Sequence, residues 1–409
     1  MKLWLLGLVS AWSLVASPNW TALFDGKSLK GWKQCNGSAP FKVEKGVIVG
    51  TTAEGSPNSF LCTEKSYGDF VLEFEVQVDP RLNSGVQIRS HQYGAETAVK
   101  TFDGKAMVER KQPAGRVYGY QVEIANEKSG VAGGIYDEAR RGWLANIAQD
   151  PAASKAFKDG QWNKYRVEAL GDHIKVAVNG VAAADLVDSV DLDGFIALQV
   201  HSFKGDSPAQ VRWRNLRIQD LGRHAWQPLG DGKTMQGWVK NGGGEWTVTG
   251  GVFAGRVTPD EQKRGFLIWN EEWKDFTVRM QYKIVQGNSG VFFRMGDPDT
   301  GTEVNKMGYE VEVDSTRDAG SLQEPGRGAR GWILHTGPAE KMDFLRPNDF
   351  NTLVIHAHGG DLTMHVNDVK TSEFKNDPGR KSGRMALQLN PRKELEVYFQ
   401  DFAILAPVR

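Results

Sequence analysis

Six polar residues stand at alternate positions within three short apolar segments of the chain. In sequence order they are Gln87 and Arg89, Gln121 and Glu123, and Gln199 and His201. Because residues i and i+2 of a β-strand point to the same side, each pair is expected to share one face of its strand. A carboxylate, a cation, several amides and an imidazole on one face could bind a polar substrate and move a proton. The alternative is an ordinary solvated face, although lysine, the usual solvating residue, is not among the six.

The same residue types return in the second half of the chain, which indicates two copies of one domain. Leu23–Lys27 followed by Gly31-Trp32 recurs as Leu229–Lys233 followed by Gly237-Trp238. The matched polar residues of the second copy are Arg294, Glu310, Glu312, Gln388 and Asn390. Two copies are too few for a solenoid. Agreement between the copies weakens the interpretation of these residues as a merely solvated face.

A glycine-containing polar segment, residues 133–143, supplies further candidates. Tyr136 could donate a proton, Asp137 could supply a carboxylate, Arg141 a cation and Trp143 a ring for stacking against a sugar. The matched residues of the second copy are Gln323, Glu324, Arg330 and Trp332. The structural alternative makes Trp143 a core anchor and pairs Arg141 with a carboxylate.

Support for metal or nucleophile chemistry is weak. His356, His358 and His365 flank a Gly359-Gly360 turn, but the first copy has no histidine at the matched positions. A zinc site needs three or four converging ligands, so we expect no metal and no other cofactor. The sequence shows no serine nucleophile elbow and no phosphate loop. Cys35 and Cys62 both lie in the first copy, and either one disulfide or two buried thiols would fit.

Short alternating segments separated by Gly, Asn, Asp and Pro predict an all-β fold. Residues 173–178 run into Asn179-Gly180, which is typical of a strand entering a tight hairpin. We therefore predict two tandem β-sandwiches, residues 19–221 and 226–407, joined by a short linker and packed against each other. Between Arg89 and Tyr120 there are 31 positions, against 15 between Arg294 and Tyr309. The first copy thus carries an insertion within residues 91–117, which we expect to form a lid or rim loop rather than a disordered segment.

Charge and targeting signals restrict the function classes. The 409 residues include 50 Lys and Arg and 50 Asp and Glu, so nothing suggests nucleic acid or an anionic membrane as partner. Lys2, an apolar run over residues 3–15 and Ala16 predict a signal peptide, residues 1–16. The run is short for a membrane span, and we expect a periplasmic or secreted protein with no span in its mature form.

Several motifs together resemble one family. They are Leu23–Lys27 with Gly31-Trp32, Asn83–Gly85, Gly134–Asp137, and Trp162-Asn163 with Asn179-Gly180. In combination they are similar to the 3-keto-disaccharide (3-keto-glycoside) hydrolase family, over essentially the whole mature chain, twice. The resemblance implies concanavalin A-like jelly-roll sandwiches. It also implies cleavage of glycosides that a separate sugar 3-dehydrogenase has already oxidised at C3.

The resemblance also implies roles for individual residues. Glu123 would remove the C2 proton, Arg89 and Gln121 would bind the enolate or the substrate, and Tyr136 or His201 would protonate the leaving oxygen. Asp137 and Arg141 would organise their loop. The further candidates for substrate binding are Gln87, Trp143, Gln199, Arg294, Arg330, Trp332 and Gln388.

Two points stay open from the sequence. The family usually has Glu at the position of Gln121, where the second copy has Glu310, so either copy could be active. We favour the first copy because it keeps Tyr136-Asp137 and the insertion.

The competing interpretations are a tandem carbohydrate-binding module and a scaffold with vestigial polar faces. Glu310 and Glu312 could also serve as the carboxylate pair of a conventional glycosidase.

Overall fold

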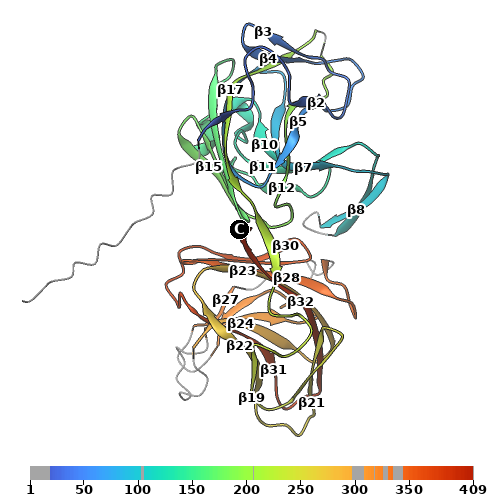
Figure 1. Cartoon of the computed structure of the whole chain (residues 1–409), viewed down its shortest axis with the longest axis vertical. Coiled ribbons are helices and arrows are strands. Elements are labelled where there is room, and N and C mark those ends of the chain that lie inside the picture. Colours follow the sequence, from blue (N-terminus) through green and yellow to red (C-terminus); the bar gives the residue numbers. More distant parts are fainter. Residues whose placement is uncertain are drawn as a thin grey trace, which may run out of the picture.

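The computed structural model describes residues 19–102, 106–205, 207–296, 308–316, 318–325, 330–334 and 344–408. These residues form two β-sandwiches that follow each other along the chain and stack end to end (Figure 1). Each sandwich pairs an eight-stranded sheet with a seven-stranded sheet, and all the pairings are antiparallel. The predicted all-β class with two tandem jelly-roll sandwiches is confirmed. Within the described residues, no helix is long and apolar enough to cross a membrane.

The first domain contains strands β1 to β17. Its eight-stranded sheet has the order β15 (Val181–Val187), β14 (His173–Val178), β13 (Asn163–Leu170), β6 (Asp69–Val78), β17 (Gln210–Gly222), β4 (Val47–Thr51) and β3 (Phe41–Glu44), with β1 (Thr21–Ala22) beside β17. Its seven-stranded sheet has the order β12 (Gly142–Ala145), β11 (Ile135–Glu138), β10 (Val117–Ile124), β7 (Ser84–Gln92), β16 (Gly194–Val200), β5 (Ser59–Tyr67) and β2 (Trp32–Gln34). Two 3-10 turns, η1 (Glu127–Ser129) and η2 (Ala153–Lys155), lie in its loops.

The second domain repeats this arrangement. Its eight-stranded sheet has the order β20 (Glu245–Thr249), β21 (Val252–Val257), β32 (Leu395–Pro407), β23 (Phe276–Gln286), β28 (Asn351–His358), β29 (Asp361–Val366) and β30 (Val369–Phe374), with β18 (His224–Pro228) beside β32. Its seven-stranded sheet has the order β19 (Trp238–Gly242), β22 (Gly265–Trp273), β31 (Gly383–Leu389), β24 (Ser289–Met295), β25 (Tyr309–Val313), β26 (Leu322–Glu324) and β27 (Gly331–Leu334).

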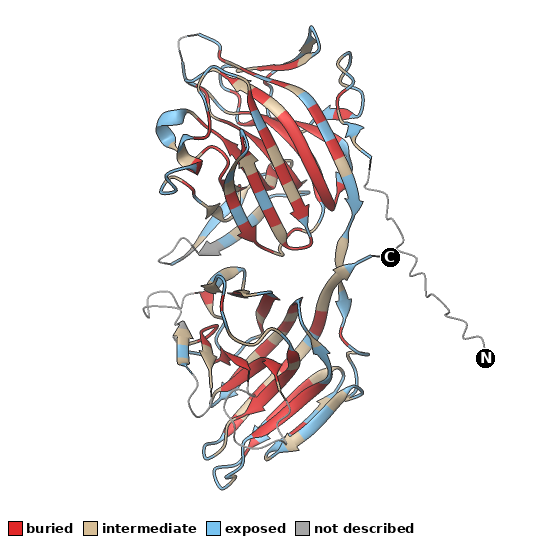
Figure 2. Cartoon of the chain, turned by 90° about the vertical axis from the view of Figure 1, so that its left-hand side faces the viewer, coloured by how far each residue is buried: buried red, intermediate tan, exposed pale blue. Residues whose placement is uncertain are grey.

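The alternation of side chains along each strand builds the core between the two sheets. On β6 the residues Phe70, Leu72, Phe74 and Val76 are buried in the core of the first domain, and Glu73 lies on the outer face. Figure 2 shows the resulting stripes of buried and exposed positions along the strands. The predicted hairpin after β14 is confirmed, since Asn179 and Gly180 both have left-handed backbones, with φ of 51° and 82°.

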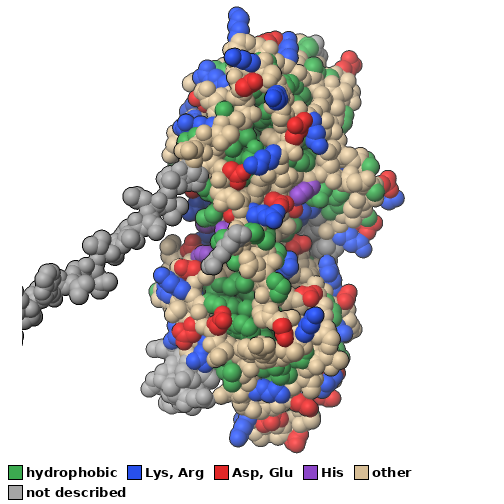
Figure 3. Space-filling view, in the orientation of Figure 1, with side chains coloured by type: hydrophobic (Ala, Val, Ile, Leu, Met, Phe, Trp, Pro, Cys, Tyr) green, Lys and Arg blue, Asp and Glu red, His purple; other side chains and the backbone are tan. Residues whose placement is uncertain are grey.

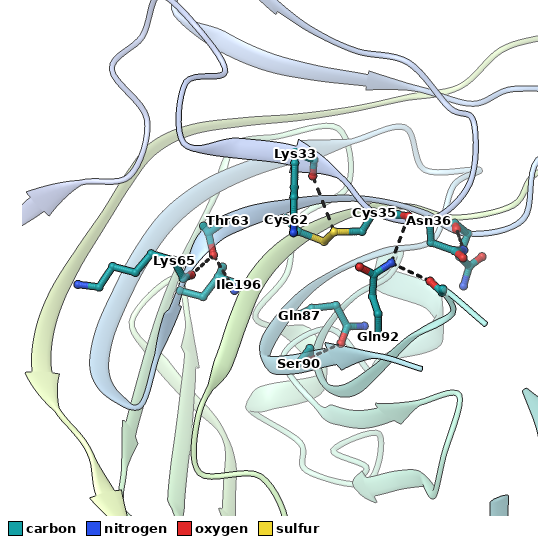
Figure 4. Close-up of a disulfide and its surroundings, with 12 residues drawn as sticks. Lys33, Cys35, Asn36, Cys62, Thr63, Lys65, Gln87, Ser90, Gln92 and Ile196 are labelled. Carbon is teal, nitrogen blue, oxygen red and sulfur yellow. Dashed lines mark hydrogen bonds between the residues drawn. A yellow bond between two sulfur atoms is a disulfide. The ribbon is translucent and has the colours of Figure 1, made fainter. Parts of the chain in front are cut away.

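Of the two alternatives for the cysteines, the structure has the disulfide. Cys35 and Cys62 are bonded, with their Cα atoms 6.1 Å apart, so the bond joins the segment after β2 to β5 (Figure 4). The Gln92 amide donates to the Cys35 carbonyl at 3.2 Å and to the Gly115 carbonyl at 2.8 Å. Cys62 belongs to a small apolar cluster on the outer side of the seven-stranded sheet. The disulfide therefore fixes one end of that face.

The insertion of the first domain forms a hairpin. Strands β8 (Thr97–Phe102) and β9 (Met107–Gln112) pair with each other in a separate two-stranded sheet. The hairpin projects from the side of the first domain (Figure 1). The insertion is thus ordered along these strands, and its role as a lid or rim stays a prediction.

The two domains are connected almost without a linker and touch each other. Strand β17 ends at Gly222 and β18 begins at His224. Asp172 of the first domain accepts a hydrogen bond from Thr277 Oγ1 at 2.8 Å, and its Oδ2 lies 2.9 Å from His356 Nδ1. Histidine side chains are visible at this junction in Figure 3. The predicted signal peptide, residues 1–16, lies outside the described residues.

Candidate active site

The outer face of the first domain's seven-stranded sheet carries one continuous row of polar and aromatic residues. Antiparallel register places Gln87 opposite Gln121, Gln121 opposite Tyr136, and Tyr136 opposite Trp143. Directly opposite residues share a face, so their side chains are neighbours. On the other side of Gln87 the row continues to Ala197, which lies opposite the disulfide-bonded Cys62. Strand alternation thus brings together residues that are far apart in the sequence.

Glu123 is a buried carboxylate on this face. Its Oε1 accepts a hydrogen bond from Asn83 Nδ2 at 2.5 Å, and its Oε2 accepts one from Gln121 Nε2 at 2.9 Å. The side chain is almost fully buried. Burial raises the pKa of Glu123 above the ordinary glutamate value and Glu138 adds to this, although the two hydrogen bonds oppose it. A carboxylate with a raised pKa is a stronger base once it is ionised.

Three glutamines form the floor beside Glu123. The amide groups of Gln87 and Gln121 are 2.8 Å apart, and Gln199 Nε2 donates to Gln121 Oε1 at 2.8 Å. All three side chains are buried. Among the residues that the structure describes, Gln199 Oε1 has no hydrogen-bond partner, and neither has Gln388 Oε1, its counterpart in the second domain. A buried acceptor left open in both copies is suited to receive a donor from a ligand.

A second carboxylate on this face, Glu138, was not among the candidates predicted from the sequence. Glu138 lies two residues beyond Tyr136 on β11 and is nearly buried. Arg116 forms an ion pair with it, and Asn58 Nδ2 donates to its Oε1 at 3.2 Å. The i, i+2 rule could have found Glu138, whereas Asn58 and Arg116 come from distant segments and carry no such signal. Asn83 was recognised as a repeated landmark but not as a partner of Glu123.

Tyr136, Trp143 and His201 lie at the edge of this face. The Tyr136 ring is half-buried and contacts Trp143 edge-on, with ring centroids 5.4 Å apart. Burial raises the pKa of the Tyr136 hydroxyl, and Glu138 adds to the increase. Trp143 is 42% exposed, so it is not a core anchor. His201 Nδ1 is 2.8 Å from the Ser202 carbonyl oxygen. The backbone N–H of Ser202 donates to Asn58 at 3.0 Å, and Asn58 also contacts Glu138, so His201 lies at the end of the face that carries Glu138.

The second domain presents a carboxylate pair on the matching face. Glu310 and Glu312 alternate along β25, and Glu310 lies opposite Gln323. Asn288 donates to Glu312 at 2.6 Å and Gln323 donates to it at 3.2 Å. Burial raises the pKa of Glu310 to about 8, with a further contribution from Glu312. Burial likewise raises the pKa of Glu312 to about 7. Trp332 is 43% exposed at the edge, as Trp143 is in the first domain.

Both sandwiches match one family model, that of the 3-keto-alpha-glucoside-1,2-lyase-like domain, over residues 19–219 and 225–405. The chain belongs to this family. It therefore contains two lyase-like domains in tandem, as the motifs implied, and it is a carbohydrate-active protein by family.

The chain is also similar to several solved structures, each over about half of its length. A protein from Parabacteroides distasonis ATCC 8503, provisionally described as a glycosyl hydrolase, is 22% identical and covers 50% of this chain and 100% of its own, with a TM-score of 0.32. A second such protein from the same organism is 19% identical, covers 49% and 94%, and has a TM-score of 0.33. Carbohydrate-binding module CBM66 from Bacillus subtilis is 18% identical, covers 46% and 95%, and has a TM-score of 0.31. No curated protein matches the chain.

Arg89 does not share the glutamine face of the first lyase-like domain, and that prediction is wrong. Its φ is 46°, and the β7–β10 register shifts beside it. This bulge turns the side chain to the other side of the sheet, where it is fully buried. Its guanidinium donates to the carbonyls of Gly68 at 2.8 Å and Gly171 at 2.6 Å, and pairs with Asp69 at 3.2 Å. Arg89 is therefore a structural clamp and not a substrate ligand.

Arg294 repeats this clamp in the second lyase-like domain. Its φ is 51°, its side chain is buried, and it donates to the carbonyls of Lys274, Gly359 and Arg380. The prediction that Arg294 binds substrate is therefore also not supported by its position.

Asp137 and Arg141 lie on the core side of β11 and in the turn that follows it. Arg141 forms ion pairs with Asp137 and, at 2.8 Å, with Asp188, which also accepts from the Tyr120 hydroxyl. Although burial opposes it, Arg141 lowers the pKa of Asp188 to about 2. Arg330 makes the matching contact with Asp377 at 2.6 Å. The structural alternative for Arg141 is thus the observed one, and these residues support the site from behind rather than lining it.

The three histidines of the second lyase-like domain lie toward the first domain. His356 and His358 stack with ring centroids 4.4 Å apart, and His365 is buried. His356 contacts Asp172 and Thr277 as described above. In the part of the chain that the structure describes, no three His, Cys, Asp or Glu side chains are arranged to hold a metal ion.

Proposed function

We propose that the protein cleaves 3-keto-glycosides by removing the C2 proton and eliminating the C1 substituent, after which water adds. The ketone at C3 acidifies the C2 proton, so a carboxylate can take it and leave an enolate. The electron pair then expels the C1 oxygen, which leaves with a proton from an acid. Addition of water to the unsaturated ketosugar completes a net hydrolysis.

The observation that carries this proposal is the environment of Glu123. It is a buried carboxylate with a raised pKa, held by Asn83 and Gln121 beside amides that have an open acceptor. We assign it as the base, and a positioned base contributes roughly 10²–10⁴ in rate. Gln87, Gln121 and Gln199 would bind the sugar hydroxyls or the enolate oxygen. Arg116, paired with Glu138, provides the nearby positive charge that we had expected from Arg89.

The remaining roles follow from position. Tyr136 or His201 would protonate the leaving oxygen, because both lie at the edge of the Glu123 face. The exposed Trp143 would stack against a sugar ring. The β8–β9 hairpin would form the rim, since Arg110 on β9 is close enough to Tyr136 to lower its pKa against the effect of burial. The substrate requires a separate enzyme that oxidises the C3 hydroxyl of a glycoside.

We further propose that the protein is exported to the periplasm or the medium. The expected signal peptide and the Cys35–Cys62 disulfide support this, because disulfides persist in oxidising compartments.

The alternative is a tandem carbohydrate-binding module, and the exposed Trp143 and Trp332 favour it. Product analysis separates the two functions. The mature protein and the variants Glu123→Gln and Glu312→Gln would be incubated with a 3-keto-glucoside and, in parallel, with the unoxidised glucoside. We expect cleavage of the keto substrate only, lost in Glu123→Gln. Loss in Glu312→Gln alone would assign the reaction to the second domain. Binding without cleavage of either compound would favour the binding module.

A further inference from the structure

We infer that a groove on the outer face of the second domain's eight-stranded sheet binds a neutral glycan, apart from both glutamine or glutamate faces. The inference rests on the proposed function in one respect, because that function gives the reason to expect a glycan nearby.

The groove lies where the two domains meet. It has a volume of about 740 Å³, within the range of small-ligand sites. Outward-facing residues of β23 and β28 and the linker strand β18 line it, and Ser189 and Val190 of the first domain contribute as well. Most of the lining therefore belongs to the second domain, and the first domain adds one edge.

A cation with unused donors lies in this groove. Arg279 on β23 is half-buried and its guanidinium lies over the Trp226 ring, 4.5 Å from the centroid. It forms no ion pair and no hydrogen bond with the described residues. A guanidinium has five N–H donors in a fixed geometry, so several of them remain available to a ligand.

The matching position of the first domain shows the contrast. There Glu73 stands at the place of Arg279, and it is paired with Arg166 at 3.0 Å and Arg217 at 2.6 Å. Arg217 in turn lies over Trp20, which is the counterpart of Trp226. The first domain also has a groove at this place, of about 450 Å³, but its Glu73 is paired with arginines, whereas Arg279 in the second domain keeps donors available to a ligand.

The lining suits a neutral polyhydroxylated ligand. The cations Arg279 and Lys233 face three carboxylates, those of Asp231, Asp368 and Asp401, so negative charge is in slight excess. Donors and acceptors are therefore both present, and the slight excess of negative charge disfavours an anionic ligand. Apolar residues between them match the C–H faces of sugar rings.

Calorimetric titration of the full mature protein with neutral hexasaccharides (maltohexaose, cellohexaose and laminarihexaose) tests the inference. We expect one of them to bind wild type, with affinity at least tenfold weaker in Trp226→Ala and in Arg279→Gln. The matched variant Trp20→Ala should bind as wild type does. Equal affinity in the groove variants, absence of binding by all three hexasaccharides, or binding only of a charged oligogalacturonate would overturn the inference.

A cleavage assay with a small 3-keto-glucoside keeps this result separate from the proposed function. The groove variants should retain wild-type turnover within about twofold, because the groove is not part of the Glu123 face. If wild type binds the hexasaccharide through the groove but cleaves no keto substrate, the proposed function fails and the groove stands. If wild type cleaves the keto substrate but binds no hexasaccharide through the groove, the inference about the groove fails and the proposed function is supported.

Discussion

Gln121 and Glu310 occupy the same place in the two seven-stranded sheets. Gln121 lies opposite Tyr136, and Glu310 lies opposite Gln323, the residue that takes the place of Tyr136. The first domain therefore has one carboxylate beside a glutamine on β10, and the second has two on β25. The two faces share a framework but differ in the number of carboxylates on this strand.

Restoring a carboxylate at position 121 should change the pH dependence of the proposed reaction. In Gln121→Glu, the new charge would lie next to Glu123 and raise its pKa further. Because the base must be ionised, the acidic limb of the kcat/KM profile should move to higher pH by roughly one unit. Gln121→Met is the control: it removes only the hydrogen bond that lowers the pKa of Glu123 and adds no charge, so it should move the limb upward by less than Gln121→Glu does. An unshifted limb in Gln121→Glu would exclude Glu123 as the titrating base.

The glutamate pair of the second domain should make that domain less stable as pH rises. The folded pKa values of Glu310 and Glu312, about 8 and about 7, are above the ordinary value of 4.5. Between these limits the unfolded chain releases protons that the folded domain retains, so the free energy of unfolding falls with increasing pH. We expect a decrease of at most about 7 kcal/mol from pH 5 to pH 9 in denaturant titrations. Glu310→Gln should flatten this slope, and the exposed Glu245→Gln should not.

Opening the disulfide should destabilise the first domain. Cys35 and Cys62 are 27 positions apart, and closing such a loop limits the unfolded chain. The expected loss of unfolding free energy is about 3 kcal/mol in the Cys35→Ser, Cys62→Ser double variant. Wild type treated with reductant should lose a similar amount, while the second domain should unfold unchanged. Equal stability with and without the bond would show that it does not constrain the native fold.

Replacing Arg89 should destabilise the first domain, because its guanidinium donates to two buried backbone carbonyls. Arg89→Lys removes donors from two buried carbonyls, so we expect a loss of about 2–5 kcal/mol in unfolding free energy. Turnover per folded molecule should change little, because the guanidinium does not reach the Glu123 face. Surface-exposed Arg212→Lys is the matched control. A variant with normal stability but lost turnover would return Arg89 to the active site.

Strand alternation was sufficient to predict most of the glutamine face. Gln87, Gln121, Glu123 and Gln199 lie together because three strands with one apolar side must turn the other side outward. The same rule failed at Arg89, because a bulge with a left-handed residue turns the side chain to the opposite face of the strand. The sequence does not indicate this bulge, since arginine is not a residue that favours a left-handed backbone. Asn58 and Arg116 reach Glu138 only through the tertiary fold, and short-range patterns cannot place such contacts.

The glycine that faces each clamp offers one more consequence. A Cβ on Gly194 would come within 2.4 Å of the Arg89 carbonyl carbon, and a Cβ on Gly383 would come within 2.4 Å of that of Arg294. Both domains thus have an arginine with a glycine packed against its backbone, whereas Gln121 and Glu310 differ at matched positions. A side chain at either glycine would therefore disturb the buried arginine of its own domain, and it would leave the residues that distinguish the two outer faces in place.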